Sequence, residues 1–411
     1  NLEELESLCQ ACDIAPVFTI TQSLDAPHQA LYIGSGKVHE VKEAAANLDA
    51  DLIIFDNALS PSQARNLNLE IGLPILDRTA LILEIFQSRA RSREAKLQVE
   101  LARLQYLLPR LSGMGTAMSR QGGGSGSRSN KGAGEKKLEL DRRHISHRIT
   151  ECKKELQTIK KQRVTQRKSR NASQILSVAL VGYTNAGKST ILNAMLSHYG
   201  NDEITDISHK KVLQEDMLFA TLDTTVRKIT IPGKPAFYLS DTVGFIDKLP
   251  HHLIDAFRST LEEAIGADLL LQVVDVSDPY YREHMRVTQD TLNDLGAGDI
   301  PMLIVYNKAD RLPQFAHDLP IVTGNHIHMA AGADLGMDAL ADLILSNLFG
   351  KPVTMELLIP YSQGSLVHRI SEAGEVAKTE YQNDGTYMQV TFTPSAKDHA
   401  LMQEVASYRI G

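Results

Sequence analysis

Apolar residues in the middle of the chain follow two alternating patterns. Apolar stretches at Ile175–Val181 and Leu303–Tyr306, with Phe237–Ser240 between them, predict short buried strands. The segment Ser189–Leu196 instead carries its apolar residues at helical spacing. Buried strands that alternate with amphipathic helices predict an α/β domain with a mostly parallel sheet, which we assign to residues 173–350.

Residues 1–86 show the same alternation on a smaller scale and predict a small α/β domain. The expected helices are Leu2–Cys12, Val38–Leu48, Ser60–Gly72 and one from about Thr79, and the expected strands are Pro16–Thr21, Asp51–Phe55 and Pro74–Leu76. The stretch Ile33–Lys37 has the glycines of a nucleotide-binding turn. It lacks the rest of either phosphate motif, so we favour a plain strand-to-helix turn there.

A heptad-like spacing of leucine and isoleucine marks residues 87–172. Two such seams predict an antiparallel helical hairpin, with Leu97, Leu101, Leu104, Leu108 and Leu111 on one helix and Leu138, Ile145, Ile149, Cys152, Leu156 and Ile159 on the other. The connection Gly113–Gly134 is rich in glycine and serine and includes Arg120, Arg128 and Lys131. Such a tip suits insertion into RNA, because glycine permits close approach while Arg and Lys contact phosphates.

Residues 351–411 predict a small α+β domain of βαββα order. Thr354–Ile359 is expected to form a strand, Gly364–Ala373 a helix, and Glu380–Phe392 a hairpin that turns at Asn383–Gly385. We identify no catalytic constellation in this segment of the sequence.

Length and composition add only outer bounds to this picture. A chain of 411 residues is expected to form two to four domains, and 43% hydrophobic with 23% charged residues is ordinary for a soluble protein. No apolar run approaches the ~20 residues that a membrane-spanning helix needs, so we expect no membrane span. The chain begins at Asn1 without Met or an apolar signal segment, which suggests a trimmed or fragmentary N-terminus rather than a secreted protein.

The three cysteines, Cys9, Cys12 and Cys152, are too few for a disulfide framework. Cys9 and Cys12 have the C-x-x-C spacing, but no second pair or histidine cluster accompanies them. We therefore interpret them as buried thiols on a helix. This cysteine usage indicates a cytoplasmic protein.

The net charge of −7 conceals a strongly basic segment. Between Arg89 and Arg170 the chain has 22 Lys and Arg residues against 7 Asp and Glu residues. A basic segment within an otherwise acidic protein favours an anionic partner, and nucleic acid is the obvious one. The alternative is a solvated helical face whose lysines contact nothing.

Candidate chemistry is concentrated in Gly182–Ser189, which fits G-x-x-x-x-G-K-[ST] between a predicted strand and a predicted helix. Its glycines let successive N–H groups converge on phosphate oxygens, helped by the positive end of the helix. Lys188 is expected to reach the β- and γ-phosphates, and the Ser189 hydroxyl to ligate Mg²⁺. The predicted nucleotide contacts here are Gly182, Tyr183, Thr184, Asn185, Ala186, Gly187, Lys188, Ser189 and Thr190.

A D-x-x-G pattern follows the strand at Phe237–Ser240. In such a pattern Asp241 holds Mg²⁺ through water, and the Gly244 N–H group meets the γ-phosphate. The pattern is weak alone, but it gains force because it stands after a strand and downstream of the phosphate loop. The predicted contacts in it are Asp241, Thr242, Val243 and Gly244.

An N-K-x-D pattern ends the strand at Leu303–Tyr306. The Asp310 carboxylate can accept hydrogen bonds from the ring N–H and amino groups of guanine, which adenine does not offer together. Lys308 can lie along the base, and Asn307 can connect this loop to the phosphate loop. The motif consists of Asn307, Lys308, Ala309 and Asp310. Three motifs in this order, each at the end of a strand, predict a domain that binds GTP and GDP.

These residues resemble the HflX family of translation-factor-class P-loop GTPases over most of the chain. The resemblance is carried by Tyr32–Val38, Gly132–Arg143, Gly182–Ser189, Leu218–Asp223, Asp241–Ile246 and Asn307–Asp310. It implies a GTPase that binds the large ribosomal subunit and can separate stalled ribosomes. The N-terminal domain and the hairpin would then face rRNA, and we expect the protein to be a monomer.

The resemblance also extends the set of site residues. It makes Thr221 the switch residue that completes the Mg²⁺ shell beside Ser189 and Asp241, and it adds Phe219, Ala220, Thr221, Leu222 and Asp223 to the nucleotide contacts. The family's guanine-contacting Ser-Ala aligns here with Ala330 and Ala331, whose backbone N–H groups can still contact the base. The stretch His198–Lys211 is longer than usual for the family.

Phe245 stands where Ras-like switches place the glutamine that orients the attacking water. Phenylalanine cannot do so, which predicts slow intrinsic hydrolysis, with Lys188, Thr221 and Gly244 as the expected catalytic residues. Water would be positioned by backbone, by another side chain or by the ribosome. Asn185 occupies the loop position that helps to bind K⁺ in potassium-activated GTPases, so K⁺ is a candidate cofactor beside Mg²⁺.

Two other classes of function remain open. One is a tRNA-modification or ribosome-assembly GTPase, although the Cys-bearing C-terminal motif of the tRNA-modification family is missing here. The other is an RNA-binding module with a structural nucleotide, which would never release phosphate.

Overall fold

The computed structural model describes residues 2–111, 130–172, 175–200, 219, 224–247, 264–315, 317–351, 353–392, 401–402 and 404–410. Its contacts divide the chain into two compact units. The first unit contains Asn1–Ser169, Glu215–Asp223 and Ile246–Leu261, and the second contains Arg170–Gln214, Thr224–Phe245 and Glu262–Gly411. The arrangement is mixed α/β, as the sequence predicts.

The first unit begins with a small α/β arrangement. Its elements are α1 (Leu2–Ala11), α2 (Ser35–Asn47), β1 (Ile53–Phe55), α3 (Pro61–Ile71), β2 (Ile75–Asp77) and α4 (Arg78–Arg89). Strands β1 and β2 pair in parallel, and Val38, Leu67 and Ile71 lie in the core between them and the helices. The predicted strand Pro16–Thr21 is wrong, because these residues are mostly exposed and form no strand.

Helix α3 shows how local sequence sets an element's limits. The Ser60 hydroxyl accepts a hydrogen bond from the Gln63 N–H group, and the Gln63 side chain accepts one from the Ser60 N–H group, so the helix starts with a capping box. It ends at Gly72, whose φ of 87° is in the left-handed region. Both limits agree with the predicted helix Ser60–Gly72.

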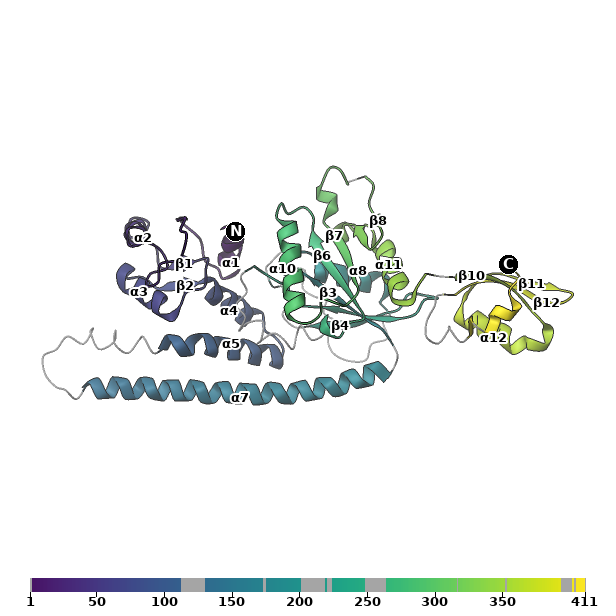
Figure 1. Ribbon diagram of the computed structural model, residues 1–411, viewed down its shortest axis with the longest axis horizontal. Coiled ribbons are helices and arrows are strands. Elements are labelled where there is room, and N and C mark those ends of the chain that lie inside the picture. The colour runs from purple at the N-terminus through teal and green to yellow at the C-terminus, as the bar shows by residue number, and fades with distance from the viewer. Residues whose placement is uncertain are drawn as a thin grey trace. The chain divides into compact units, whose positions relative to one another are not determined.

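A helical hairpin completes the first unit. It consists of α5 (Arg93–Leu111) and α7 (Asn130–Ala172), which lie side by side (Figure 1). The Arg93–Glu155 and Arg148–Glu100 ion pairs show that the helices are antiparallel, as predicted. The described seam joins Leu97 and Leu101 to Ile149, Cys152, Leu156 and Ile159. The predicted tip residues Arg120 and Arg128, and the side chain of Lys131, lie outside the described residues.

The second unit is built on a seven-stranded sheet of order β4-β5-β3-β6-β7-β9-β8. The central strands β5 (Phe237–Asp241), β3 (Ser177–Gly182), β6 (Leu269–Asp275), β7 (Met302–Asn307) and β9 (His326–His328) are parallel. The antiparallel edges are β4 (Thr225–Ile229) and β8 (Ile321–Thr323). The carboxyl ends of parallel strands meet at one edge of a sheet, so the three predicted motifs are brought together there.

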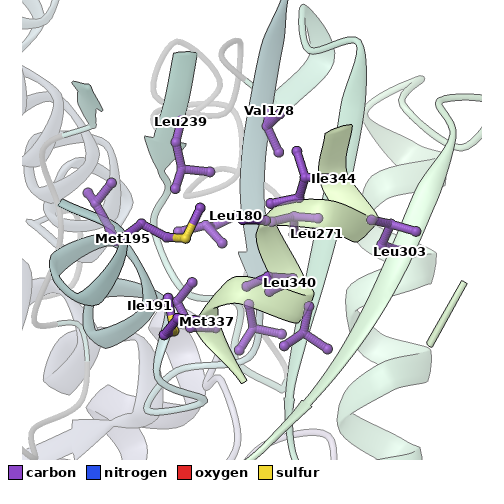
Figure 2. Close-up of a cluster of buried hydrophobic side chains, with 14 of the residues drawn as sticks. Val178, Leu180, Ile191, Met195, Leu239, Leu271, Leu303, Met337, Leu340 and Ile344 are labelled. Carbon is purple, nitrogen blue, oxygen red and sulfur yellow. The ribbon is translucent and has the colours of Figure 1, made fainter. Parts of the chain in front are cut away.

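Helices cover both faces of this sheet. On one face, α8 (Lys188–Tyr199) and α11 (Met337–Phe349) pack against alternate strand residues, as Figure 2 shows for Leu180, Leu271 and Leu303. On the other face lies α10 (Tyr281–Asp294), where the Met285 carbonyl accepts a hydrogen bond from the Gln272 side chain. Within the described part of the chain, no helix has the length and hydropathy that crossing a membrane requires.

The C-terminal part of the second unit has the predicted order of strand, helix and hairpin. An antiparallel sheet of β10 (Val353–Ile359), β12 (Gly385–Phe392) and β11 (Glu375–Gln382) packs on α12 (Gly364–Ala373). Residues Leu357, Ile370 and Val390 are fully buried in this core. Short 3-10 turns complete the described elements of the unit at Ala309–Arg311, Ala331–Ala333, Tyr361–Gln363 and Ala406–Tyr408.

Candidate functional site

The predicted phosphate loop lies between β3 and α8, and close packing explains its two glycines. Gly182 has a φ of 143°, and a Cβ atom there would lie 2.2 Å from the carbonyl oxygen of Val273. Gly187 has a φ of 96°, and a Cβ atom there would lie 2.2 Å from the side-chain nitrogen of Asn307. No larger residue fits either position without moving the loop. The loop therefore leads into the N-terminus of α8 as a preformed anion cradle.

Lys188 is buried beneath this loop, with 6% of its surface exposed. Its ammonium group donates to the carbonyl oxygens of Gly182 at 3.0 Å and Tyr183 at 2.7 Å. Burial lowers the pKa of Lys188 to about 8, and the Asp241 carboxylate opposes this shift only in part. A phosphate anion placed beside this group would favour its charged form.

Ser189 and Asp241 meet at the start of α8 and the end of β5. The Ser189 hydroxyl donates to a carboxylate oxygen of Asp241 at 2.6 Å, and Asp241 is fully buried. The neighbouring Thr242 hydroxyl donates to the Leu180 carbonyl at 2.7 Å and so fixes the D-x-x-G segment against β3. Hydroxyl and carboxylate oxygens are the hard ligands that Mg²⁺ prefers. The pair therefore fits the Mg²⁺ site that the sequence predicts.

The residue after the D-x-x-G segment, Phe245, pairs with the phosphate loop. The Phe245 N–H group donates to the Gly182 carbonyl at 3.1 Å, and the Phe245 carbonyl accepts from the Thr184 N–H group at 2.8 Å. A Cβ atom on Gly244 would lie 2.9 Å from Thr184 Cα and 3.0 Å from the Lys188 ammonium. Gly244 is therefore held against the loop, while Phe245 is buried and offers no polar side-chain group.

Asn307 connects the N-K-x-D loop to its neighbours. Its side-chain NH₂ group donates to the Ala186 carbonyl at 2.9 Å, and its side-chain oxygen accepts from the Ala331 N–H group at 3.0 Å. The connection to the phosphate loop agrees with the prediction for Asn307. Ala330 and Ala331 are both buried. Because the Ala331 N–H group already has a protein partner, its contact with guanine stays a prediction.

Lys308 connects the phosphate loop to the end of β6. Its ammonium group donates to the Asn185 carbonyl at 2.8 Å and forms an ion pair with Asp275 at 2.7 Å. Asp275 is itself fixed by the backbone N–H and hydroxyl groups of Ser277, at 3.0 and 2.5 Å. Asp310 lies on the turn Ala309–Arg311 with an exposed side chain. This arrangement leaves the Asp310 carboxylate accessible to a base.

Two residues of this site were missed by the sequence analysis. Asp275 ends β6 and holds Lys308, and the signal that could have found it is a polar residue at the end of a buried apolar strand. His284 of α10 stacks on Tyr183 of the phosphate loop, with ring centroids 3.8 Å apart and planes 10° apart. No sequence signal identifies His284, because the two rings are far apart along the chain.

The remaining predicted contacts are placed as follows. Thr190 lies half-buried in the first turn of α8, whereas Ala186, Val243 and Ala309 are buried near the site. Phe219 belongs to the first unit, where its ring packs edge-on against Phe86 at 4.6 Å between centroids. The contact of Phe219 with nucleotide stays a prediction. The other predicted contacts of this stretch, Ala220, Thr221, Leu222 and Asp223, lie outside the described residues.

Family models match three consecutive parts of the chain. Residues 1–87 match the model described as GTP-binding GTPase N-terminal. Residues 89–170 match the GTP-binding GTPase Middle Region. Residues 177–308, which carry the three motifs, match the model described as 50S ribosome-binding GTPase.

Curated relatives match nearly the whole chain. A protein named GTPase HflX from Lacrimispora saccharolytica is 42% identical over 96% of this chain and 90% of its own length. Proteins of the same name from Caldanaerobacter subterraneus and Escherichia coli are 43% and 38% identical, over 97% and 94% of this chain and 89% and 88% of their own. A solved GTP-binding protein from Sulfolobus solfataricus in complex with GDP is 25% identical, with a TM-score of 0.40, and covers 84% of this chain and 94% of that one.

Proposed function

The chain belongs to the HflX family of GTPases, and from this premise we propose that it is a GTP-driven switch that binds the large ribosomal subunit and separates or rescues stalled ribosomes. The observation that carries the proposal is the joining, in one chain, of a guanine-nucleotide site to a basic helical hairpin. The description of the matched family model, 50S ribosome-binding GTPase, supports the choice of partner. Ribosomes are cytoplasmic, so the protein would act there, as a monomer.

The described part of the hairpin supports an RNA-facing role. Helix α7 exposes Arg142, Arg143, Lys153, Lys154, Lys160 and Lys161. Its acidic residues are partly neutralised within the hairpin, where Glu155 pairs with Arg93. A long cationic helix raises the rate of encounter with rRNA through electrostatic attraction and contacts phosphates without reading sequence. We therefore propose residues 1–86 and 87–172 as ribosome-facing domains, residues 173–350 as the GTPase domain, and residues 351–411 as an appended domain.

The proposed roles of the site residues follow from its contacts. The phosphate loop and Lys188 hold the phosphates, and Asp310 and Lys308 hold guanine, with Asp275 fixing Lys308. Ser189 and Asp241 would hold Mg²⁺, with Thr221 as a third ligand. When bound, Mg²⁺ neutralises charge on the phosphate oxygens. The Gly244 N–H group would meet the γ-phosphate, because Gly244 already lies against the loop.

Hydrolysis by the isolated protein should be slow. Phe245 is buried and has no group that can orient water. Its backbone groups are engaged by Gly182 and Thr184. A partner would have to complete the site or change this pairing, and the ribosome is the partner that the hairpin favours. We further propose that K⁺ binds beside Asn185 and offsets charge on the phosphates during the reaction.

The test combines binding with turnover. Purified large and small subunits are sedimented separately with the protein, in GDP and in a non-hydrolysable GTP analogue, and phosphate release is followed with each subunit. We expect analogue-dependent sedimentation with the large subunit and faster phosphate release in its presence. Lys188→Ala serves as the control that keeps the hairpin but loses phosphate contacts. Equal sedimentation with both subunits in both nucleotides, without stimulated release, would rule the proposal out.

A further inference from the structure

Two segments next to the nucleotide motifs pack within the first unit rather than the second. Ile246–Leu261 begins directly after Phe245, and Glu215–Asp223 contains Phe219 and the predicted switch residue Thr221. One described residue of each segment, Asp247 and Phe219 respectively, contacts the same helix, α4 (Arg78–Arg89). We call Ile246–Leu261 and Glu215–Asp223 the nucleotide-dependent segments, because they adjoin or contain Gly244 and Thr221, whose contacts with the nucleotide and Mg²⁺ are predicted.

The first contact is made by Arg78 at the start of α4. Its Nε–H group donates to the carbonyl oxygen of Asp247 at 3.2 Å. Asp247 stands three residues beyond Gly244, whose N–H group is expected to meet the γ-phosphate. Arg78 is 2% exposed and the bond itself is partly buried, and a hydrogen bond from a charged donor is stronger than a neutral one.

Acidic residues hold the Arg78 guanidinium in place for this bond. One of its terminal nitrogens pairs with Glu4 of α1, and the other pairs with Asp56 after β1 at 2.6 Å. The pKa of Arg78 is raised because these two carboxylates outweigh its desolvation. Each of the three guanidinium nitrogens thus donates one hydrogen bond. A lysine could keep the charge, but its donors all lie on one nitrogen atom and could not match the three separate positions of the guanidinium nitrogens.

The second contact is made near the other end of α4. Phe86 is 1% exposed and Phe219 is 2% exposed, and their rings meet edge-on at 4.6 Å with planes 73° apart. Such a pair contributes beyond its buried area. Phe219 lies two residues before the predicted switch residue Thr221 in the sequence.

The start of α4 is also connected to the helical hairpin. Asp77 caps α4 by accepting from the Ala80 N–H group at 2.9 Å. The same carboxylate accepts from Tyr106 of α5 at 2.9 Å and from Arg110 of α5 at 3.1 Å. Asp77 is adjacent to Arg78 in sequence. Hydrogen bonds of Asp77 to the hairpin and of Arg78 to the Asp247 carbonyl are therefore joined by a single peptide bond at the start of α4.

We propose that α4 is a relay that couples the occupant of the hairpin to both nucleotide-dependent segments, with Arg78 as its positioning residue. The identity of the occupant, the large ribosomal subunit, rests on the proposed function, whereas the response of α4 to nucleotide does not. Coupling of this kind is reciprocal. If the GTP state raises affinity for the occupant by some factor, the occupant raises affinity for the GTP state by the same factor.

The first test uses the isolated protein. The chain contains no tryptophan, so Phe86→Trp supplies a single fluorescent reporter beside Phe219. We expect its emission to change when GDP is replaced by a non-hydrolysable GTP analogue. A tryptophan at Leu69, which is 54% exposed on α3, is the control and should not respond. Hydrogen exchange of peptides from α4 in the unmodified protein gives the same comparison without a substitution.

The second test measures the coupling factor by sedimentation with large subunits in GTP analogue and in GDP. Arg78→Lys and Tyr106→Phe should each lower the ratio of the two affinities at least fivefold, within the usual range of coupling factors of about 5–150. Ile82→Val removes one methyl group from a fully buried residue of α4 and should leave the ratio unchanged. Tyr106→Phe should leave intrinsic hydrolysis unchanged.

The two arms separate the two proposals. If α4 shows the same fluorescence and the same exchange in GDP and in the GTP analogue, the relay is refuted, whatever the protein binds. If wild-type ratios persist in folded Arg78→Lys and Tyr106→Phe, the relay is refuted as well. If the wild type fails to sediment with large subunits in any nucleotide, the proposed function falls, and the fluorescence and exchange results alone decide the relay.

Discussion

Lys188 predicts a proton uptake that accompanies nucleotide binding. The group is buried, donates to two carbonyl oxygens and has its pKa lowered to about 8. Phosphate anions of a bound nucleotide favour the charged ammonium, so the pKa of Lys188 must rise on binding. A group that is partly neutral in the free protein and fully charged in the complex takes a proton from the buffer.

The size of the uptake follows from the pKa. With a value of about 8, roughly a tenth of Lys188 is neutral at pH 7, about half at pH 8 and about three quarters at pH 8.5. Nucleotide binding at pH 8.5 should therefore take up about 0.75 proton, against about 0.1 at pH 7. The sign is fixed by linkage: because the complex binds more protons, affinity falls as pH rises through this range.

Titration calorimetry of GDP binding in buffers of different ionisation enthalpy measures this uptake directly, as the slope of observed enthalpy against buffer enthalpy. Lys188→Arg is the matched control, because arginine stays charged throughout and should show no uptake from this position. A slope near zero for the wild type at pH 8.5, or an equal slope for wild type and Lys188→Arg, would contradict the assignment of a partly neutral Lys188.

Three further predictions concern single residues or ions of the site. Asp275→Asn removes the carboxylate that pairs with Lys308, and the side chains of Lys308 and Asp275 are 16% and 21% exposed. The substitution should weaken GTP binding about fivefold in fluorescence titrations, with little change in ATP binding, and unchanged GTP affinity would contradict the role of Asp275. Gly187→Ala places a Cβ atom 2.2 Å from the Asn307 side chain, at a backbone position with a φ of 96°. Nucleotide binding should therefore be lost, although circular dichroism should show a folded protein, and normal binding would show that the loop adjusts. Hydrolysis should be faster in K⁺ than in Na⁺ in matched chloride buffers, and identical rates would remove the role proposed for Asn185.

Much of the site could be predicted because its residues obey local rules. The three motifs stand at the ends of β3, β5 and β7, and parallel strands present these ends at one edge of the sheet. The limits of α3 were equally predictable, since Ser60 and Gly72 terminate a helix by hydrogen bonding and backbone conformation that depend only on neighbours.

The rest could not be predicted because it depends on contacts through space. Pro16–Thr21 has the apolar residues of a strand, but β1 and β2 pair with each other and this segment stays exposed. The support of Lys308 by Asp275 and the stacking of His284 on Tyr183 join residues from separate elements. A buried arginine such as Arg78 gives no sequence signal, since its three partners come from three distant stretches of chain.

The measurement that tests the account most directly joins the guanine site to ribosome binding. Asp310→Asn should exchange the preference for guanine for a preference for xanthine, because the amide presents a donor where the carboxylate presents only acceptors. Large subunits are sedimented with wild type and with Asp310→Asn, each in non-hydrolysable analogues of GTP and of xanthosine triphosphate. We expect the wild type to sediment only with the guanine analogue and Asp310→Asn only with the xanthine analogue. Sedimentation of Asp310→Asn that responds to the guanine analogue as the wild type does would contradict the claim that this site switches ribosome binding.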